Sequence, residues 1–162
     1  MVAFDASTLI LLAKIDLLRQ VTEKTEIIIS DEVKDEVVRK KTFDSQIIER
    51  LIAENKIVIV SSSNKDELLS LKKEYKLDKG EASVLLLAYN KKIMLATDDG
   101  MAIKACKILN IKFLNAVHFL ILLANKKIIT AEIALLKLNE LKRYGRYRAD
   151  IINKAINLIQ GG

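Results

Sequence analysis

The sequence predicts an α/β protein whose mainly parallel sheet is covered by helices on both faces, a three-layer α/β/α sandwich. Short apolar runs rich in Ile, Leu, Val and Ala alternate with longer amphipathic segments, a pattern typical of βαβ units. Most of these runs lack polar alternation, as expected of strands that are buried on both faces. With 162 residues, 51% of them hydrophobic, the chain is long enough to build one well-packed core.

Five apolar runs are the expected strands, and each is short and rich in residues that favour extended backbone. In chain order, the predicted strands are residues 2–4, 26–29, 57–60, 93–96 and 112–114. The segments between and after them predict helices, because apolar residues recur there at i, i+3, i+4 and i+7. This spacing is clearest at Ala102, Ala105, Cys106 and Leu109, at Ala131, Ala134, Leu135 and Leu138, and at Ile152, Ala155, Ile156 and Ile159.

The helix that follows the second strand has a recognisable start. Ser30 is its expected N-cap, since Asp31 and Glu32 follow in the first turn, where the helix dipole favours negative charge. We find no linker, repeat or low-complexity tract along the chain. We therefore expect a single domain over residues 1–162, with a core of about residues 1–125 and a C-terminal helical extension of about residues 126–162.

Composition narrows the classes of function. The formal net charge of +6 weakly favours an anionic partner such as nucleic acid. A single cysteine, Cys106, permits no intrachain disulfide, and one histidine, His118, leaves too few ligands for a usual structural zinc site. These features predict a cytoplasmic protein. Asp5 interrupts the apolar start, which argues against a signal peptide, and no run approaches the ~18 apolar residues that span a membrane.

Acidic residues stand where an open α/β sheet places its ligands, beyond the carboxyl ends of the strands. Asp5 directly follows the first predicted strand, and Asp98 and Asp99 directly follow the fourth. Glu36 lies about two turns into the helix after the second strand, and Glu81 lies near the start of the helix before the fourth. We expect these five carboxylates, from segments far apart in sequence, to meet at one edge of the sheet.

Such a cluster favours a bound cation, because like charges at short range repel one another and raise each other's pKa. Mg²⁺ or Mn²⁺ relieves this conflict and prefers oxygen ligands. Two such ions can activate a water molecule and stabilise the leaving oxygen of a phosphodiester. This chemistry needs neither histidine nor cysteine, so it suits a chain that has one of each.

Each acid also has a purely structural interpretation. An aspartate after a strand often caps the next helix, which applies to Asp5, and the Asp98-Asp99 pair before Gly100 has the composition of a turn followed by an N-cap. Glu36 is compatible with a solvated helix face. Glu81 is compatible with an acid that the helix dipole favours in the first turn. Only the joint placement of these residues points to a site.

Four short segments together resemble the successive acidic motifs of PIN domains. They are Phe-Asp-Ala-Ser at residues 4–7, Ile-Ser-Asp-Glu-Val-Lys-Asp-Glu-Val at 29–37, Gly-Glu-Ala-Ser at 80–83 and Ala-Thr-Asp-Asp at 96–99. Their order and spacing match, and the resemblance covers roughly residues 1–125. It is closest to the small prokaryotic PIN proteins that include VapC-type toxins, although this chain continues past their minimal length through two further helical segments.

The resemblance implies a divalent-metal ribonuclease acting on an RNA substrate, a homodimer, and a partner antitoxin that occludes the site, as in toxin–antitoxin pairs. It assigns one or two Mg²⁺ or Mn²⁺ ions to the site. By position in the motifs, the metal ligands are Asp5, Glu36, Glu81 and Asp99, with Asp98 as an additional catalytic acid and Ser7 and Thr97 as polar supports. Glu81 departs from the pattern, since many relatives have aspartate there.

A basic segment near the C-terminus is a candidate for RNA binding. Arg143, Arg146 and Arg148 could hold phosphates, and Tyr144 could stack on an unpaired base. The alternative is a polar turn between two amphipathic helices.

Other classes of function remain as alternatives. The main one is a catalytically inactive PIN-like module that binds RNA or protein and has a regulatory role. Phosphate-transfer domains fit less well. A haloacid-dehalogenase-like phosphatase needs Asp-x-Asp after its first strand, where this chain has Ser7 as the third residue, and a response-regulator receiver needs its acidic pair there. A dinucleotide-binding domain needs a glycine-rich first turn, which Asp5-Ala6-Ser7 does not provide.

Overall fold

The computed structural model describes residues 1–61 and 64–162. Within these residues, five parallel strands form one sheet in the order β3-β2-β1-β4-β5. Their bounds are β1 (Val2–Phe4), β2 (Ile27–Ser30), β3 (Ile57–Val60), β4 (Met94–Ala96) and β5 (Phe113–Leu114). The predicted α/β class with a parallel sheet flanked by helices is therefore confirmed.

Three predicted strands differ from the observed ones by one residue, the second at both ends and the fourth and fifth at their starts. Ser30 belongs to β2 because it pairs with Val60 of β3, while its side chain accepts a hydrogen bond from the backbone N–H of Val33 and so caps the next helix, as predicted. The fourth strand begins after Ile93, because the N–H of Ile93 is used in closing the preceding helix on Ala88 at 3.1 Å. The fifth strand likewise begins one residue late.

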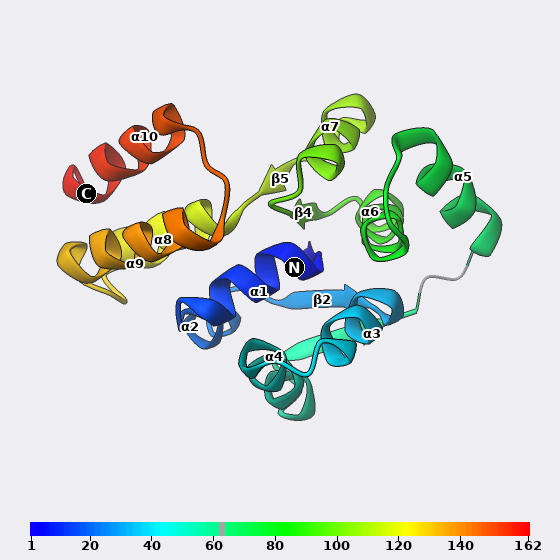
Figure 1. Cartoon of the computed structure of the whole chain (residues 1–162), viewed down its shortest axis with the longest axis horizontal. Coiled ribbons are helices and arrows are strands. Elements are labelled where there is room, and N and C mark those ends of the chain that lie inside the picture. The colour runs from blue at the N-terminus through cyan, green and yellow to red at the C-terminus, as the bar shows by residue number, and fades with distance from the viewer. Residues whose placement is uncertain (62–63) are drawn as a thin grey trace.

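The helices form two packed groups with the sheet between them (Figure 1). Helices α1, α4 and α8 lie in one group, and α5, α6 and α7 lie in the other, while α3 contacts α6 at the end of the sheet. The helices described are α1 (Ala6–Lys14), α2 (Leu18–Thr22), α3 (Asp31–Arg39), α4 (Phe43–Ala53), α5 (Lys65–Tyr75), α6 (Lys79–Lys91), α7 (Gly100–Leu109), α8 (Ala116–Asn125), α9 (Ala131–Tyr144) and α10 (Ala149–Gln160). Among the described residues, none of these helices is long and apolar enough to span a membrane.

The order of the strands creates a crevice between β1 and β4. The chain proceeds from β1 to β2 to β3 in one direction and then returns to place β4 on the other side of β1. At such a switch point the connecting segments diverge, which leaves an opening beyond the carboxyl ends of the two strands. The register pairs Phe4 with Ala96, so Asp5 and Thr97 leave the sheet side by side.

The C-terminal helices extend the molecule at the β5 edge. Helices α8, α9 and α10 pack on one another and lie together at one side of the molecule in Figure 1. Ala134, Leu138 and Leu141 of α9 are buried, as are Ile152, Ala155 and Ile159 of α10, so the predicted amphipathic faces do cover core. The segment of residues 145–148 that joins α9 to α10 returns toward the sheet.

Candidate active site

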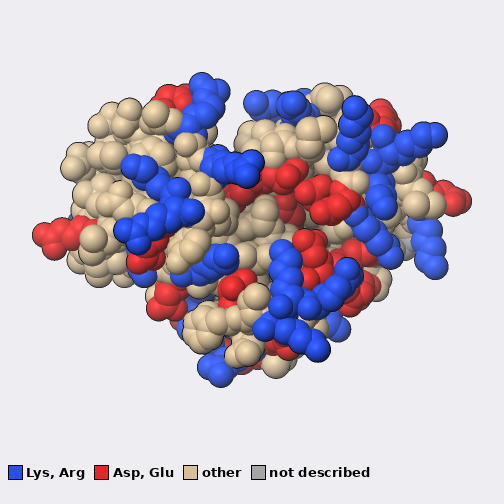
Figure 2. Space-filling model, in the orientation of Figure 1, with Lys and Arg blue, Asp and Glu red and all other residues tan. Residues whose placement is uncertain are grey.

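A cleft of about 660 Å³ opens at the carboxyl ends of β1 and β4. Its walls come from the starts of α1, α6 and α7, from α3, and from the segment between α9 and α10. Figure 2 shows acidic side chains gathered in the middle of this face and Lys and Arg side chains around them. The acids that line the cleft are Asp5, Glu36, Asp78, Glu81, Asp98 and Asp99. The structure thus brings together all five predicted acids and adds Asp78.

Asp5 is the most buried of these acids, with 2% of its surface exposed. Its Oδ1 accepts hydrogen bonds from Ser7 Oγ at 2.6 Å and from the backbone N–H of Thr8 at 3.1 Å, and its Oδ2 accepts one from the hydroxyl of Thr97. Burial raises the pKa of Asp5 to about 7, although these three hydrogen bonds oppose the shift and Asp98 adds to it. Asp5 therefore caps α1 and also places at the cleft a carboxylate whose ionised form is destabilised by burial.

Asp99 has the same double character. Its Oδ1 caps α7 by accepting hydrogen bonds from the backbone N–H groups of Met101 and Ala102, both at 2.9 Å. Its own N–H donates to Thr97 Oγ1 at 3.1 Å, so the fully buried Thr97 connects the segments that carry Asp5 and Asp99. The capping interpretation is correct for both aspartates. Each cap leaves one carboxylate oxygen outside the helix terminus.

Glu81 and Asp78 form a capping box at the start of α6. Asp78 Oδ1 accepts from the N–H of Glu81 at 2.8 Å, and Glu81 Oε2 accepts from the N–H of Asp78 at 2.9 Å. Burial raises the pKa of Glu81 to about 7, and repulsion from Asp78, Asp99 and Asp5 adds to the shift. Glu81 is therefore close enough to the other acids for their charges to raise its pKa, although the capping box engages one of its oxygens.

Glu36 reaches the cleft from α3 because Gly80 makes room for it. A Cβ added at Gly80 would lie 2.6 Å from Glu36 Oε2, closer than any ordinary contact. Burial, followed by repulsion from Asp78, raises the pKa of Glu36, while Lys40 lowers it from a distance of 3.9 Å. A buried hydrogen bond of 2.6 Å between Ser30 Oγ and Ser83 Oγ fixes the same α3–α6 junction.

This contact predicts the effect of Gly80→Ala. The new methyl group should displace the flexible end of Glu36 from the cleft, so the affinity of the purified protein for Mn²⁺, measured by calorimetry, should fall by about 10- to 100-fold. The free energy of unfolding should change by less than ~1 kcal/mol, because alanine favours a helix and only a side-chain end has to move. Gly100→Ala is the matched control, since its Cβ would meet nothing within 4 Å. Equal Mn²⁺ affinities of the two variants would contradict the assigned role of Gly80.

Both oxygens of Asp98 accept hydrogen bonds from the protein, as both oxygens of Asp5 do. Oδ1 accepts from Tyr147 Oη at 2.5 Å, and Oδ2 accepts from Thr8 Oγ1 at 2.7 Å and from the N–H of Ala116 at 3.0 Å. Its own N–H donates to Ser7 Oγ at 3.0 Å. Burial raises the pKa of Asp98, and these hydrogen bonds oppose the shift. Through these contacts Asp98 joins α1, α8 and the segment between α9 and α10, so it has a role in holding these segments together.

Of the four residues predicted to bind RNA, the structure brings two to the cleft. Arg146 and Tyr144 line it, whereas Arg143 and Arg148 do not, and Arg148 is paired with Asp150 at 3.0 Å. Lys14 also lines the cleft, with its Nζ 5.1 Å from the centre of the Tyr144 ring.

Four residues that position the acids have no site role in the sequence-based prediction. Gly80, Ser83 and Thr8 act through contacts between elements distant in sequence, whereas Asp78 acts through a local capping box with Glu81. The sequence offers Tyr147, like Tyr144, only as a ring that could stack on an RNA base, and in the structure it donates a hydrogen bond to Asp98. Only Asp78 was open to prediction as a site element, because Asp78-x-x-Glu81 is a capping-box pattern.

The donor set suits a hard divalent cation, since the cleft offers carboxylate oxygens and hydroxyls. The raised pKa values of Asp5, Glu36 and Glu81 all move in the direction that a nearby cation would reverse. Across residues 1–61 and 64–162, however, no three acidic, histidine or cysteine side chains stand close enough to hold one ion as they are. Metal binding would therefore require the carboxylates to draw together.

Several families of α/β proteins place a ligand site in a cleft at the switch point of a parallel sheet. A sequence model of one such family, DUF3368, described as a PIN domain, matches residues 1–160. The chain therefore belongs to the PIN domain family, whose members are usually metal-dependent nucleases and typically bind divalent metals.

Comparison with solved structures supports the fold. The crystal structure of PAE2754 from Pyrobaculum aerophilum matches with a TM-score of 0.55 and 19% sequence identity, over 76% of this chain and 89% of that chain. At this identity the likeness concerns the fold alone. A search of curated proteins found no match to this sequence.

Proposed function

We propose that this protein is a ribonuclease that hydrolyses RNA phosphodiester bonds with the help of one or two Mg²⁺ or Mn²⁺ ions. The observation that carries the proposal is the convergence of Asp5, Glu36, Glu81 and Asp99, from four separate elements, on one cleft at the switch point of the sheet. Capping explains why Asp5, Glu81 and Asp99 stand at their own helix starts. It does not explain why these carboxylates and Glu36 converge on one cleft with raised pKa values for three of them, and a cationic ligand would.

The protein contributes position and charge to the reaction. Asp5, Glu36, Glu81 and Asp99 would hold the cation, which when bound supplies Lewis-acid activation of the phosphate and of water. Ser7 and Thr97 keep the carboxylate of Asp5 in one orientation. With pKa values of about 7, Asp5 and Glu81 carry protons part of the time at neutral pH, and these protons must leave before the cation binds.

The inactive binding module is the second candidate, and one observation favours it. No trio of side chains in the described parts of the chain is already arranged to hold a metal ion. A module of this kind would keep the basic rim and the fold but would bind cations weakly and cut nothing.

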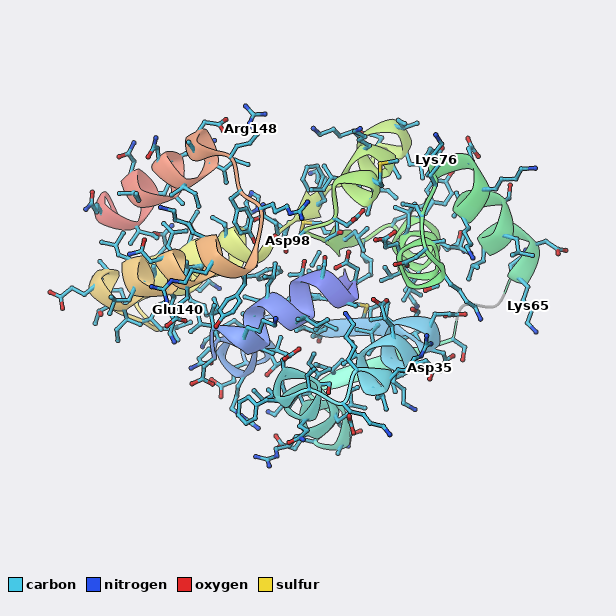
Figure 3. All side chains as sticks on the ribbon, in the orientation of Figure 1. Asp35, Lys65, Lys76, Asp98, Glu140 and Arg148 are labelled. Atoms are coloured by element: carbon cyan, nitrogen blue, oxygen red, sulfur yellow. The ribbon has the colours of Figure 1, made fainter. Side chains whose placement is uncertain are left out.

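Cleavage of a mixed RNA pool by the purified protein separates these candidates. We expect cleavage in Mg²⁺ or Mn²⁺ and none in EDTA. Glu36→Gln should lower the rate by at least about 100-fold, because it removes one negative ligand and keeps the shape. Asp35→Asn is the matched control, since the exposed Asp35 carries the same charge one residue away on α3 and does not line the cleft (Figure 3). Cleavage that persists in EDTA, or that both variants affect equally, would contradict the proposal.

Partners extend the same proposal. We include an RNA substrate, a homodimer, and an antitoxin whose binding would cover the acidic cleft, the role that a toxin of this family would require. Sedimentation of the purified chain measures the oligomeric state directly, and a monomer at all concentrations would remove the homodimer from the proposal.

A further inference from the structure

A side-chain hydrogen bond to Asp98 ties the segment between α9 and α10 to the cleft. Tyr147 donates to Asp98 Oδ1 at 2.5 Å, and Asp98 Oδ2 is bound in turn to Thr8 of α1 and to Ala116 of α8. Asp98 thus joins the segment between α9 and α10 to the starts of α1 and α8. Figure 3 shows Asp98 beside the α9–α10 segment.

The same segment has a fixed local conformation. A Cβ on Gly145 would lie 2.5 Å from Cε2 of the Tyr147 ring, so the ring packs directly on the backbone there. Burial, with a further contribution from Asp98, raises the pKa of the Tyr147 hydroxyl far above its ordinary value, which keeps it a hydrogen-bond donor. Arg146 lies between these two residues, so its backbone is held on both sides.

Arg146 has the features of a phosphate-binding residue. It is exposed and lines the acidic cleft, yet no ion pair or hydrogen bond engages its guanidinium among the residues that the structure describes. The other two basic residues of the lining have contacts, Lys40 with Glu36 at 3.9 Å and Lys14 with the Tyr144 ring. A cleft lined by carboxylates repels an RNA backbone, so a cation on its wall is needed to draw a phosphate in.

We propose that residues 144–147 form a wall of the active site, that the Tyr147–Asp98 hydrogen bond fastens this wall, and that Arg146 on it binds a phosphate of a single RNA strand entering the cleft. Tyr147 and Asp98 are positioning residues, and Arg146 is the residue that touches the substrate. This inference rests on the proposed ribonuclease function, because it names how the substrate of that reaction is held.

The first test measures binding without cleavage. A fluorescein-labelled single-stranded RNA of mixed sequence, roughly a dozen nucleotides long, is titrated with the full chain in EDTA. Arg146→Gln should raise Kd about tenfold and reduce the slope of log K against log salt by about 0.7, the share of one phosphate contact on a single strand. Arg148→Gln, which removes the same charge two residues away, should leave both values unchanged. Equal effects of the two variants would overturn the role of Arg146.

The second test addresses the fastening. Tyr147→Phe keeps the ring and removes the hydroxyl, so Kd should rise about five- to tenfold, while kcat at saturating RNA should change less than twofold. Tyr147→Phe combined with Arg146→Gln should be no weaker than Arg146→Gln alone, because both changes remove one contact. If the losses of RNA affinity in the two single variants added up in the double variant, or if Tyr147→Phe lowered kcat alone, the proposed role of the Tyr147–Asp98 hydrogen bond would be wrong. Thermal unfolding of each variant identifies loss of fold, which Arg146→Gln at an exposed position avoids.

These outcomes are distinct from failure of the ribonuclease proposal. RNA binding that depends on Arg146, together with no cleavage by the wild-type protein in any cation, would overturn the nuclease function and keep Arg146 as an RNA contact. If Arg146→Gln cleaved RNA with the KM of the wild-type protein, the proposed role of residues 144–147 in binding RNA would be wrong, and the proposed ribonuclease function would stand.

Discussion

Asp5→Asn is expected to lower the rate of RNA cleavage by about 1,000-fold or more and at the same time to stabilise the metal-free protein. Asp5 is the acid that the protein buries most completely, and it lies between the strand ends that form the switch point. Asparagine is as good an N-cap as aspartate, so the cap on Thr8 survives the change. The change removes the charge that a cation would bind, and the amide nitrogen that replaces Oδ2 has to donate to Thr97 where the carboxylate accepted.

The stability effect has a defined pH dependence. Folding raises the pKa of Asp5 from 3.8 to about 7, so between these values the folded state binds more protons than the unfolded state. Stability of the metal-free wild-type protein must then fall as pH rises through this window and level off above about pH 8. The cost reaches at most on the order of 4 kcal/mol, and Asp5→Asn should escape it.

Urea unfolding in EDTA at pH 5 and pH 8 measures this effect. The wild-type protein should be less stable at pH 8 than Asp5→Asn, and the two should converge toward pH 4. If the wild-type protein gained stability with rising pH, or if Asp5→Asn were less stable than the wild-type protein at pH 8, the charge of Asp5 would not destabilise the folded state.

The affinity for Mn²⁺ is expected to rise about 100-fold between pH 6 and pH 8 and to change little above that. Asp5 and Glu81 both have a pKa of about 7, so two protons must leave before both carboxylates can serve as ligands. At pH 6 about one molecule in a hundred has both acids ionised, and at pH 8 most do. Glu36 has its pKa raised for the same reason and steepens the dependence.

Calorimetry in two buffers with different ionisation enthalpies measures the affinity and the number of protons released together. Between one and two protons should leave per ion bound at pH 6, and fewer at pH 8. Glu81→Gln should release about one proton fewer. An affinity that stays constant from pH 6 to pH 8 would mean that these two acids do not bind the ion.

The parts of the fold that local pattern determines could be predicted from the sequence. Apolar runs located every strand to within a residue at each end, because a buried parallel strand has few other compositions. The start of α3 at Ser30 followed from capping chemistry alone. The strand order could not be predicted, since it depends on how α6 crosses the sheet, and it is this order that places β4 beside β1.

The acids of the site could be predicted as a set, because Asp5, Asp98 and Asp99 follow strands, Glu81 lies in a first helical turn and Glu36 lies in the helix that directly follows a strand. Their different environments could not. Asp98 and Asp99 are neighbours in sequence, yet Asp98 faces Tyr147 across 49 positions of chain and Asp99 turns to cap α7. Likewise, Gly80 has a role only because α3 and α6 meet there. Long-range contacts assign such roles, and a single sequence does not display them.

The most direct test of a metal-binding active site is a crystal of the protein grown at pH 8 with Mn²⁺ and measured for anomalous scattering. We expect an anomalous-difference peak for Mn²⁺ in the cleft, about 2.1–2.3 Å from carboxylate oxygens of Asp5 and Asp99, with Glu36 and Glu81 moved toward it. Asp98 should keep its hydrogen bond to Tyr147 and stay outside the coordination sphere. An empty cleft at saturating Mn²⁺, or a peak only elsewhere on the surface, would contradict it.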